Sequence, residues 1–259
     1  MRALFIGDVV GPRAVAELER WIPQLRERHA LDLVIVDAEN CGADGECMEL
    51  AAVEGLVAAG ADVVTGGNHA FDGEEVDAVL AHPRVVRPLN VAEDVPGRGV
   101  LTVRAAGEEV RVVVLADKLA LDWSPPWAHM TEHPYAAFAA LPPGPGTTVV
   151  EMHALSVTAK QGLAYALDGE VAAVLGTHTH EPTLPLHLLP HGTALVTDVG
   201  MTGPVDGPQG MRADRVAADV RDPPPLEDRE PPGPADGEIV LAAVLLEIEG
   251  GLTRSISRL

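Results

Sequence analysis

In the first third of the chain, short continuous apolar runs, typical of buried strands, alternate with segments whose apolar residues recur at helical spacing. Over Arg13–His29 they recur every three or four residues, which places Val15, Leu18 and Ile22 on one stripe of a helix. The series of predicted elements is a strand at Arg2–Gly7, a helix at Arg13–His29, a strand at Leu31–Asp37, a helix at Glu46–Ala59, a short strand before the glycines of 61–69 and a helix at Glu74–Leu80. Strands that alternate with helices predict a largely parallel sheet with helices packed on it.

The rest of the chain contains more predicted strands than helices. The last pair is a terminal hairpin within 238–259, which turns at Gly250–Gly251. The other predicted elements are strands at Gly99–Arg104 and Glu109–Leu115, a strand at Thr147–Met152, a helix at Ser156–Leu167, and strands at Val171–Leu175, Pro185–Leu189 and Thr193–Thr197. We therefore expect an α/β fold in a single domain, 1–259, with a mixed sheet or two packed sheets.

Two segments interrupt this pattern. Residues 116–146 are irregular and contain several prolines together with Trp123 and Trp127. A long stretch without regular structure in a compact domain is usually functional or a lid. Since aromatic residues make up only 3% of the chain, we expect both tryptophans to pack in this loop, with stacking on a nucleobase as the alternative. Residues 221–237 are proline-rich and charged, which predicts a flexible segment.

Composition narrows the class of protein. The chain has 259 residues, of which 47% are hydrophobic, and a net charge of −21. That charge repels nucleic-acid polymers and anionic membranes, while a small anionic substrate stays compatible with local cations in a cleft. No apolar run approaches the ~20 residues of a membrane span, and Asp8 cuts short the apolar start, which argues against a signal peptide. Cys41 and Cys47 form no disulfide framework, so we expect free thiols in a cytoplasmic protein.

Polar side chains follow one predicted strand after another. Because the loops of adjacent parallel strands converge at the carboxyl edge of a sheet, we expect these side chains to meet there. Carboxylates, carboxamides and imidazoles together are the donors of a metal site built from oxygen and nitrogen. In chain order, the strand ends supply Asp8, then Asp37, Glu39 and Asn40, then Asn68 and His69, then Glu151 and His153, then His178 and His180.

This set of donors is too large for one ion, which takes about four to six. A carboxylate such as Glu39 can bridge two ions, so the sequence favours a pair of metals, typically ~3.5–4 Å apart. Each residue has a simpler alternative; Asp8, for example, could cap a helix. The loop GDVVG is a poor candidate for a phosphate-binding loop, because it lacks both the GxGxxG pattern and the P-loop lysine. These simpler roles do not explain why such residues follow five strands in succession.

Several short motifs carry a family resemblance. GDVVG, DAEN, GGNHAFD, EMH and GTHTH, in this order, resemble the motifs of the calcineurin-like metallophosphoesterases, and VTDVGMTGP is similar to the branch of YmdB-like phosphodiesterases that act on cyclic nucleotides. The resemblance covers residues 1–211 and the final hairpin, and it implies a two-sheet β-sandwich flanked by helices. It also implies that His69 contacts phosphate and protonates the leaving oxygen. The implied ligands are Asp8, Asn40 and His180 for one metal and Asn68, His153 and His178 for the other, with Glu39 bridging.

The chain departs from the family pattern at two positions beside these motifs. Val10 stands where the wider superfamily has a histidine, and we expect Asn40 to fill that place. Leu155 replaces a carboxylate of the branch, and the middle segment VLADKLALDWSPPWAHM also matches the branch poorly. We expect these regions to line the substrate pocket, so the resemblance says least about the identity of the substrate.

Taken together, the residues and the resemblance predict a phosphodiesterase for cyclic nucleotides or similar small phosphodiesters, which uses a hydroxide between two metal ions. Iron or manganese suits the donors best, with zinc or magnesium as alternatives and Cys41 as an alternative soft ligand. A metal-binding regulatory protein with little turnover and a phosphomonoesterase are the alternative functions. Homo-oligomerisation is left open. Since Lys118 and Lys160 are the only lysines, the metals must supply most of the positive charge.

Overall fold

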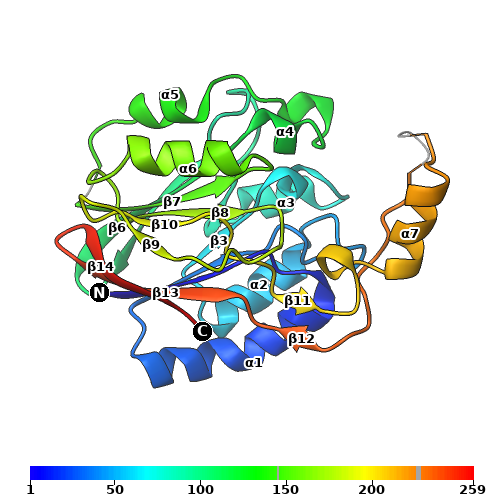
Figure 1. The fold of residues 1–259 in the computed structure, drawn as a ribbon, viewed down its shortest axis with the longest axis horizontal. Coiled ribbons are helices and arrows are strands. Elements are labelled where there is room, and N and C mark those ends of the chain that lie inside the picture. The colour runs from blue at the N-terminus through cyan, green and yellow to red at the C-terminus, as the bar shows by residue number, and fades with distance from the viewer. Residues whose placement is uncertain (145, 226–228) are drawn as a thin grey trace.

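The strands of this protein form two six-stranded sheets that pack face to face between layers of helices (Figure 1). The computed structural model describes residues 1–144, 146–225 and 229–259. The expected α/β sandwich flanked by helices is confirmed, in its two-sheet form.

The first sheet contains the N-terminal strands and the terminal hairpin. In spatial order it consists of β14 (Leu252–Arg258), β13 (Ala243–Glu249), β1 (Arg2–Ile6), β2 (Leu33–Asp37), β3 (Val63–Thr65) and β4 (Val85–Val86). The run from β1 to β4 is parallel, whereas β13 and β14 are antiparallel to their neighbours. Leu4 and Ile6 point toward the helices, while Ala3 and Phe5 face the second sheet. Burial on both faces explains why β1 is apolar from Ala3 to Ile6.

The second sheet has a parallel centre with antiparallel edges. In spatial order it consists of β5 (Val100–Ala105), β6 (Glu108–Ala116), β7 (Thr147–His153), β8 (Ala173–Thr177), β10 (Ala194–Val196) and β9 (His187–Leu188). Val112 and Val114 of β6 pack against the first sheet, and Val113 and Leu115 pack on the opposite side, under helices. The carboxyl ends of β6, β7, β8 and β10 therefore lie along one edge.

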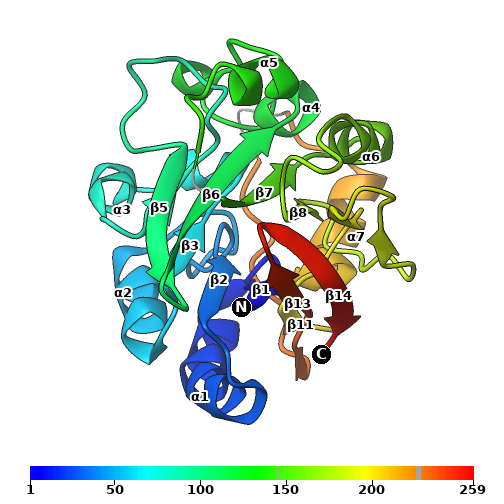
Figure 2. The same ribbon diagram turned by 90° about the vertical axis from the view of Figure 1, so that its left-hand side faces the viewer.

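Helices cover the outer face of each sheet (Figure 2). On the first sheet these are α1 (Gly11–His29), α2 (Leu50–Ala59) and α3 (Val76–Ala81); on the second they are α5 (Pro134–Ala139) and α6 (Val157–Ala166). The predicted stripe of Val15, Leu18 and Ile22 is buried. Helix α1 begins two residues earlier than predicted because Pro12 is well suited to a first helical turn.

The structure also differs from the sequence analysis in one loop and at the start of two elements. Residues 116–146 are not irregular throughout, because they contain α4 (Lys118–Leu121), the 3-10 helix η2 (Pro126–Ala128) and α5. Helix α2 begins at Leu50 rather than Glu46, since the backbone N–H of Gly42 donates to the Cys47 carbonyl at 2.9 Å and keeps the preceding loop from coiling. The terminal hairpin starts only at Ala243. Before it, β12 (Ile239–Val240) pairs with β11 (Gly203–Pro204) instead.

Helix α7 (Ala213–Arg221) stands apart from the layers (Figure 1). None of its residues is buried. It leads into 221–237, for which flexibility was predicted; residues 226–228 of that segment lie outside the described part of the chain. Among the described residues, no helix combines the length and the apolar character that crossing a membrane requires.

Candidate metal centre

The two sheets bring all the predicted ligands to one edge of the sandwich. The β1–β2 and β7–β8 pairs are parallel, so their carboxyl ends point in the same direction. Asp8, Asn68 and His153 have no exposed surface at all, and Glu39 is 1% exposed. The residues come from the ends of β1 (Asp8), β2 (Glu39 and Asn40), β3 (Asn68 in the 3-10 helix η1, Asn68–Phe71), β7 (His153) and β8 (His178 and His180).

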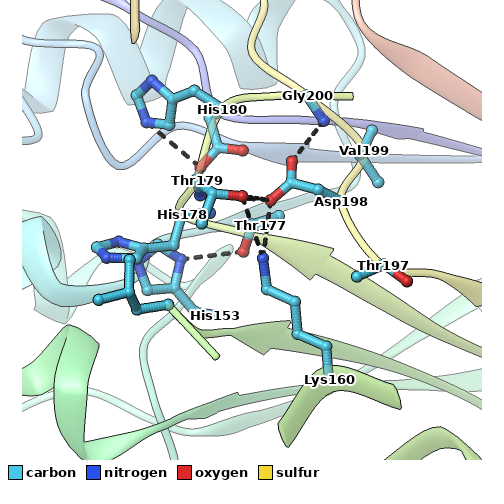
Figure 3. Close-up of polar contacts among 12 residues, drawn as sticks. His153, Lys160, Thr177, His178, Thr179, His180, Thr197, Asp198, Val199 and Gly200 are labelled. Atoms are coloured by element: carbon cyan, nitrogen blue, oxygen red, sulfur yellow. Dashed lines mark hydrogen bonds and ion pairs between the residues drawn. The ribbon is translucent and has the colours of Figure 1, made fainter. Parts of the chain in front are cut away.

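One group of donors converges on the ring of His153. Its Nε2 atom lies 2.9 Å from Oδ1 of Asn68 and 3.1 Å from Oε2 of Glu39. One ligand atom each of Glu39, His153 and His178 lie within 4.8 Å of one another. The other ring nitrogen, Nδ1 of His153, lies 3.0 Å from the hydroxyl of Thr177, which orients the ring (Figure 3). Nε2 is therefore the atom that faces the donor group.

A second group of donors surrounds Asp8. Ligand atoms of Asp8, Glu39 and His180 also lie within 4.8 Å of one another. Nδ1 of His180 is 2.9 Å from the Gln209 carbonyl, which turns Nε2 toward Asp8. Asn40 donates its Nδ2–H to the Gly45 carbonyl at 2.7 Å and keeps its side-chain oxygen free. Glu39 belongs to both groups, which is the arrangement that a bridging carboxylate needs.

Buried polar atoms without partners test whether these residues fit a metal pair. Burying a polar atom without a hydrogen bond costs about 1–3 kcal/mol, so such atoms are rare unless a ligand satisfies them. Four predicted ligands each carry one in the described structure. Oδ2 of Asp8, Oδ1 of Asn40 and Nδ1 of His178 are atoms with lone pairs that a cation would satisfy, whereas Nδ2 of Asn68 is a donor that a cation would not satisfy. For Asn68 the amide oxygen that contacts His153 is the atom suited to a cation. The residues present fit metal ions.

The electrostatics of the cluster lead to the same conclusion. Burial, followed by the charges of Asp198 and Glu39, raises the pKa of Asp8 well above its usual value. Burial also raises the pKa of Glu39 to about 7, despite the nearby His69. In the opposite direction, burial lowers the pKa of His178 to about 3. The carboxylates of the cluster lie close together without a counter-ion, and the imidazoles beside them are neutral and have free lone pairs. A divalent cation would stabilise such an environment.

His69 lies beside the donor groups and takes no part in either of them. Its Nδ1 is 3.0 Å from Oδ2 of Asp72, and its backbone N–H points toward Glu39. Burial lowers the pKa of His69, but the Asp72 hydrogen bond and the Glu39 charge outweigh it, so the pKa is raised overall. A protonated imidazole at this position can donate a proton to a leaving oxygen.

A cavity of about 290 Å³ opens over the donor groups, and a larger one of about 690 Å³ adjoins it. Both are lined by His69, Trp123, Leu155 and Arg229. Trp127 packs edge-on against Phe71, as expected, with ring centres 5.7 Å apart. Trp123 instead lies on the cavity wall, 55% exposed, with the Arg229 guanidinium 5.5 Å from its ring centre. Leu155, one of the two departures from the family pattern, is therefore part of the cavity wall.

Two buried carboxylates near the donors were noted at strand ends but not included among the predicted ligands. Asp37 shares a group of potential ligand atoms with Asp8 and His153. Glu151 accepts a hydrogen bond from Thr177 at 2.9 Å, so it acts on His153 through that hydroxyl. A carboxylate two residues before a ligand lies on the same face of the extended chain as that ligand. This spacing is a sequence signal for a residue that supports the ligand.

The cysteines and lysines play no direct part in the described centre. Cys41 and Cys47 are free, as expected. Burial raises the pKa of Cys41 to about 12, which keeps it a thiol and removes the argument for a thiolate ligand. Lys118 pairs with Asp122 at 2.6 Å on the surface, and Lys160 is buried against Asp198.

Known proteins resemble this chain in sequence and in fold. Residues 4–259 match the family model described as YmdB-like protein. The chain is 33% identical over 258 residues to the 2′,3′-cyclic-nucleotide 2′-phosphodiesterase of Bacillus subtilis strain 168, covering 99% of this chain and 94% of that protein. A hypothetical protein from Thermus thermophilus superposes with a TM-score of 0.90 at 36% identity, covering 100% of this chain and 98% of that one. A novel phosphatase from Mycoplasma pneumoniae gives a TM-score of 0.87 at 26% identity, covering 100% of this chain and 92% of that one.

Proposed function

Because this chain belongs to the family of YmdB-like proteins and is accordingly a metallophosphoesterase, we propose that it hydrolyses 2′,3′-cyclic nucleotides at a binuclear metal centre. The expected family resemblance is confirmed. The observation that carries the proposal is the position of Glu39, whose carboxylate is common to the two donor groups. Two ions that share a carboxylate form the clamp that phosphoester hydrolysis uses.

The proposed ligand sets follow the two donor groups. The orphaned atoms of Asp8 and Asn40 support the first position, and the contacts of His153 with Asn68 and Glu39 support the second. One ion would be held by Asp8, Asn40 and His180, the other by Asn68, His153 and His178, with Glu39 shared. The donors are oxygen and nitrogen without thiolate, so we propose iron or manganese as the resident metal, with zinc and magnesium as the alternatives.

When bound, the two ions would activate a water molecule and neutralise charge on the phosphoryl oxygens. The chain's own residues supply the remaining steps. His69 holds a proton beside the cavity, and Asp72 orients its ring so that Nε2 is free to protonate the leaving ribose oxygen. Trp123 offers an exposed aromatic face in the same cavity, where a nucleobase can stack.

The size and charge of the protein favour a small substrate. With a net charge of −21, the surface repels long polyanions, so we propose that nucleic-acid polymers and anionic membranes are not its partners. The positive charge that a cyclic phosphate requires would come mainly from the metals, because Arg229 at the cavity wall is paired with Glu46 at 2.9 Å. Two free thiols are in keeping with the reducing cytoplasm, which we propose as its location.

The test is hydrolysis of 2′,3′-cyclic AMP by protein stripped of metal and reloaded with Mn²⁺. We expect metal-dependent turnover that breaks the bond to the 2′ oxygen and releases adenosine 3′-phosphate, identified by chromatography. p-Nitrophenyl phosphate and 3′,5′-cyclic AMP serve as comparison substrates. Preferential turnover of the monoester would favour the phosphomonoesterase alternative. Absence of turnover with both metals bound would favour a regulatory metal protein.

A further inference from the structure

The segment that presents His178 and His180 has an unfavourable backbone conformation. Both residues have positive φ angles, 86° and 62°, in the left-handed region. Side chains other than glycine, asparagine and aspartate rarely adopt it, and residues held there persist only where the surroundings impose it. Thr179 lies between them, so whatever fixes Thr179 fixes the direction of both imidazoles.

A buried aspartate fixes Thr179. Oδ2 of Asp198 accepts hydrogen bonds from the Thr179 hydroxyl and, at 3.3 Å, from its backbone N–H (Figure 3). The other carboxylate oxygen, Oδ1, accepts from the Gly200 N–H at 2.8 Å. Asp198 is 2% exposed. One carboxylate thus ties the segment after β8 to the segment after β10.

A buried lysine balances the charge of this aspartate. Nζ of Lys160, on α6, lies 2.8 Å from Oδ2 of Asp198 and 3.5 Å from the Thr179 hydroxyl. Lys160 is 1% exposed, and its hydrogen bonds go to Asp198 and Thr179 rather than to the proposed ligands. Its stem passes over β8 at Gly176, where a Cβ atom would lie 1.9 Å from the Thr197 carbonyl oxygen and 2.8 Å from Cδ of the lysine. The glycine therefore gives room to the Thr197 backbone first and to the lysine as well.

This pair is expensive to bury, and apolar residues of similar size could fill its place. Desolvation of two charges cancels much or all of their attraction, so a buried ion pair is weak evidence for stability. A carboxylate can, however, accept several hydrogen bonds at once, which no apolar residue can do. The pair therefore contributes by holding the groups that it hydrogen-bonds in position rather than by adding stability.

We propose that Asp198 and Lys160 are positioning residues for the metal centre. They hold Thr179 so that His178 and His180 keep their left-handed conformation and direct their rings into different donor groups. The proposal rests on the proposed metal centre and concerns the geometry of its ligands. Both residues are buried, so neither is placed to touch a substrate in the cavity.

The test compares Mn²⁺ affinity, measured by calorimetry on metal-free protein, with the melting temperature of the same metal-free sample. Thr179→Val keeps the shape of the side chain and loses the hydroxyl donor. We expect its Mn²⁺ affinity to fall about tenfold or more, the usual cost of losing a group that orients a ligand, while the metal-free melting temperature stays close to wild type. Thr179→Ser retains the donor and should restore wild-type affinity.

A second pair of variants removes the ion pair itself. Asp198→Asn alone would leave the Lys160 charge without its partner, so the informative variant is the double substitution Lys160→Met with Asp198→Asn. We expect a cooperative melt and weakened Mn²⁺ binding. Lys118→Met, at the exposed surface lysine, is the control and should bind like wild type.

Three results would overturn the positioning role. They are wild-type affinity in Thr179→Val, wild-type affinity in the double variant, and an equal loss of affinity in Thr179→Ser. The wild-type titration separates this proposal from the one it rests on. If wild type does not bind two Mn²⁺ per chain, both fail. If it binds two and the variants do as well, only the positioning role fails. Lack of diester turnover with two ions bound contradicts the proposed function alone.

Discussion

The backbone at Gly67 passes so close to the His153 ring that a Cβ atom at residue 67 would lie 2.2 Å from Nε2. No real Cβ approaches a ring nitrogen so closely, so this glycine allows the chain to pass beneath the imidazole. The next residue, Asn68, then places its amide oxygen 2.9 Å from the same nitrogen. The second glycine of GGNH is thus required by the geometry of the donor group.

Gly67→Ala should therefore disrupt the metal centre more than the fold. The new methyl group must push His153 away from Asn68 and Glu39, so we expect less than two metal ions per chain by elemental analysis. Gly162→Ala in α6 is the matched control, since a Cβ there meets nothing within 4 Å. It should keep both metals and raise the free energy of unfolding by about 0.5–1 kcal/mol. Full metal content in Gly67→Ala would contradict this account of the GGNH motif.

His69→Ala should separate metal binding from proton transfer. The ring lies outside both donor groups, so we expect two ions per chain to remain bound. Loss of a general acid lowers kcat by ~10²–10⁴-fold. The measurement is kcat at saturating Mn²⁺ together with metal content of the same sample. An unchanged kcat would remove His69 from the mechanism.

The pH–rate profile should respond to Asp72. A general acid must be protonated, so activity falls as the pH rises through its pKa. The Asp72 hydrogen bond raises the pKa of His69 against the effect of burial. Asp72→Asn removes this support, and the alkaline limb of the kcat profile should therefore move to lower pH. An unmoved limb would show that another group supplies the proton.

Glu39→Gln should stabilise the metal-free protein at alkaline pH. Burial raises the pKa of Glu39 from its ordinary 4.5 to about 7. A carboxyl group whose pKa rises on folding contributes stability below pH 4.5 and loses it as the pH rises through about 7. Ionised Glu39 then costs metal-free wild type up to about 3 kcal/mol, which glutamine avoids.

Denaturant unfolding of both metal-free proteins at pH 5 and pH 8 measures this difference. The free energy of unfolding of the variant should increase relative to that of wild type as the pH rises. Added Mn²⁺ should make wild type the more stable protein, because it stabilises wild type alone. A metal-free variant that is less stable than wild type at pH 8 would mean that the Glu39 charge stabilises the folded state.

Much of the site could be predicted because its signal is local in the sequence. Asp8, Glu39, Asn68 and His178 each follow an apolar run, and the parallel strands bring such ends together without further information. The stripe on α1 was predictable for the same reason, since its spacing alone determines which face is buried.

Other features depend on contacts between distant segments. The pairing of Lys160 with Asp198 joins residues 38 positions apart, and an isolated lysine in a helix gives no sign of burial. The start of α2 depends on hydrogen bonds made by the loop before it. The exposure of Trp123 depends on which side of its loop faces the cavity. Apolar periodicity carries no information on any of these.

We propose that two metal ions at the shared Glu39 carboxylate support phosphodiester hydrolysis. The most direct test is hydrolysis of bis-p-nitrophenyl phosphate by protein stripped of metal and titrated with Mn²⁺, with Asp8→Asn measured in parallel. We predict no turnover in the stripped protein, activity that saturates as the second ion binds, and loss of that activity in the variant. Turnover that is equal with and without metal, or unchanged in Asp8→Asn, would contradict the account.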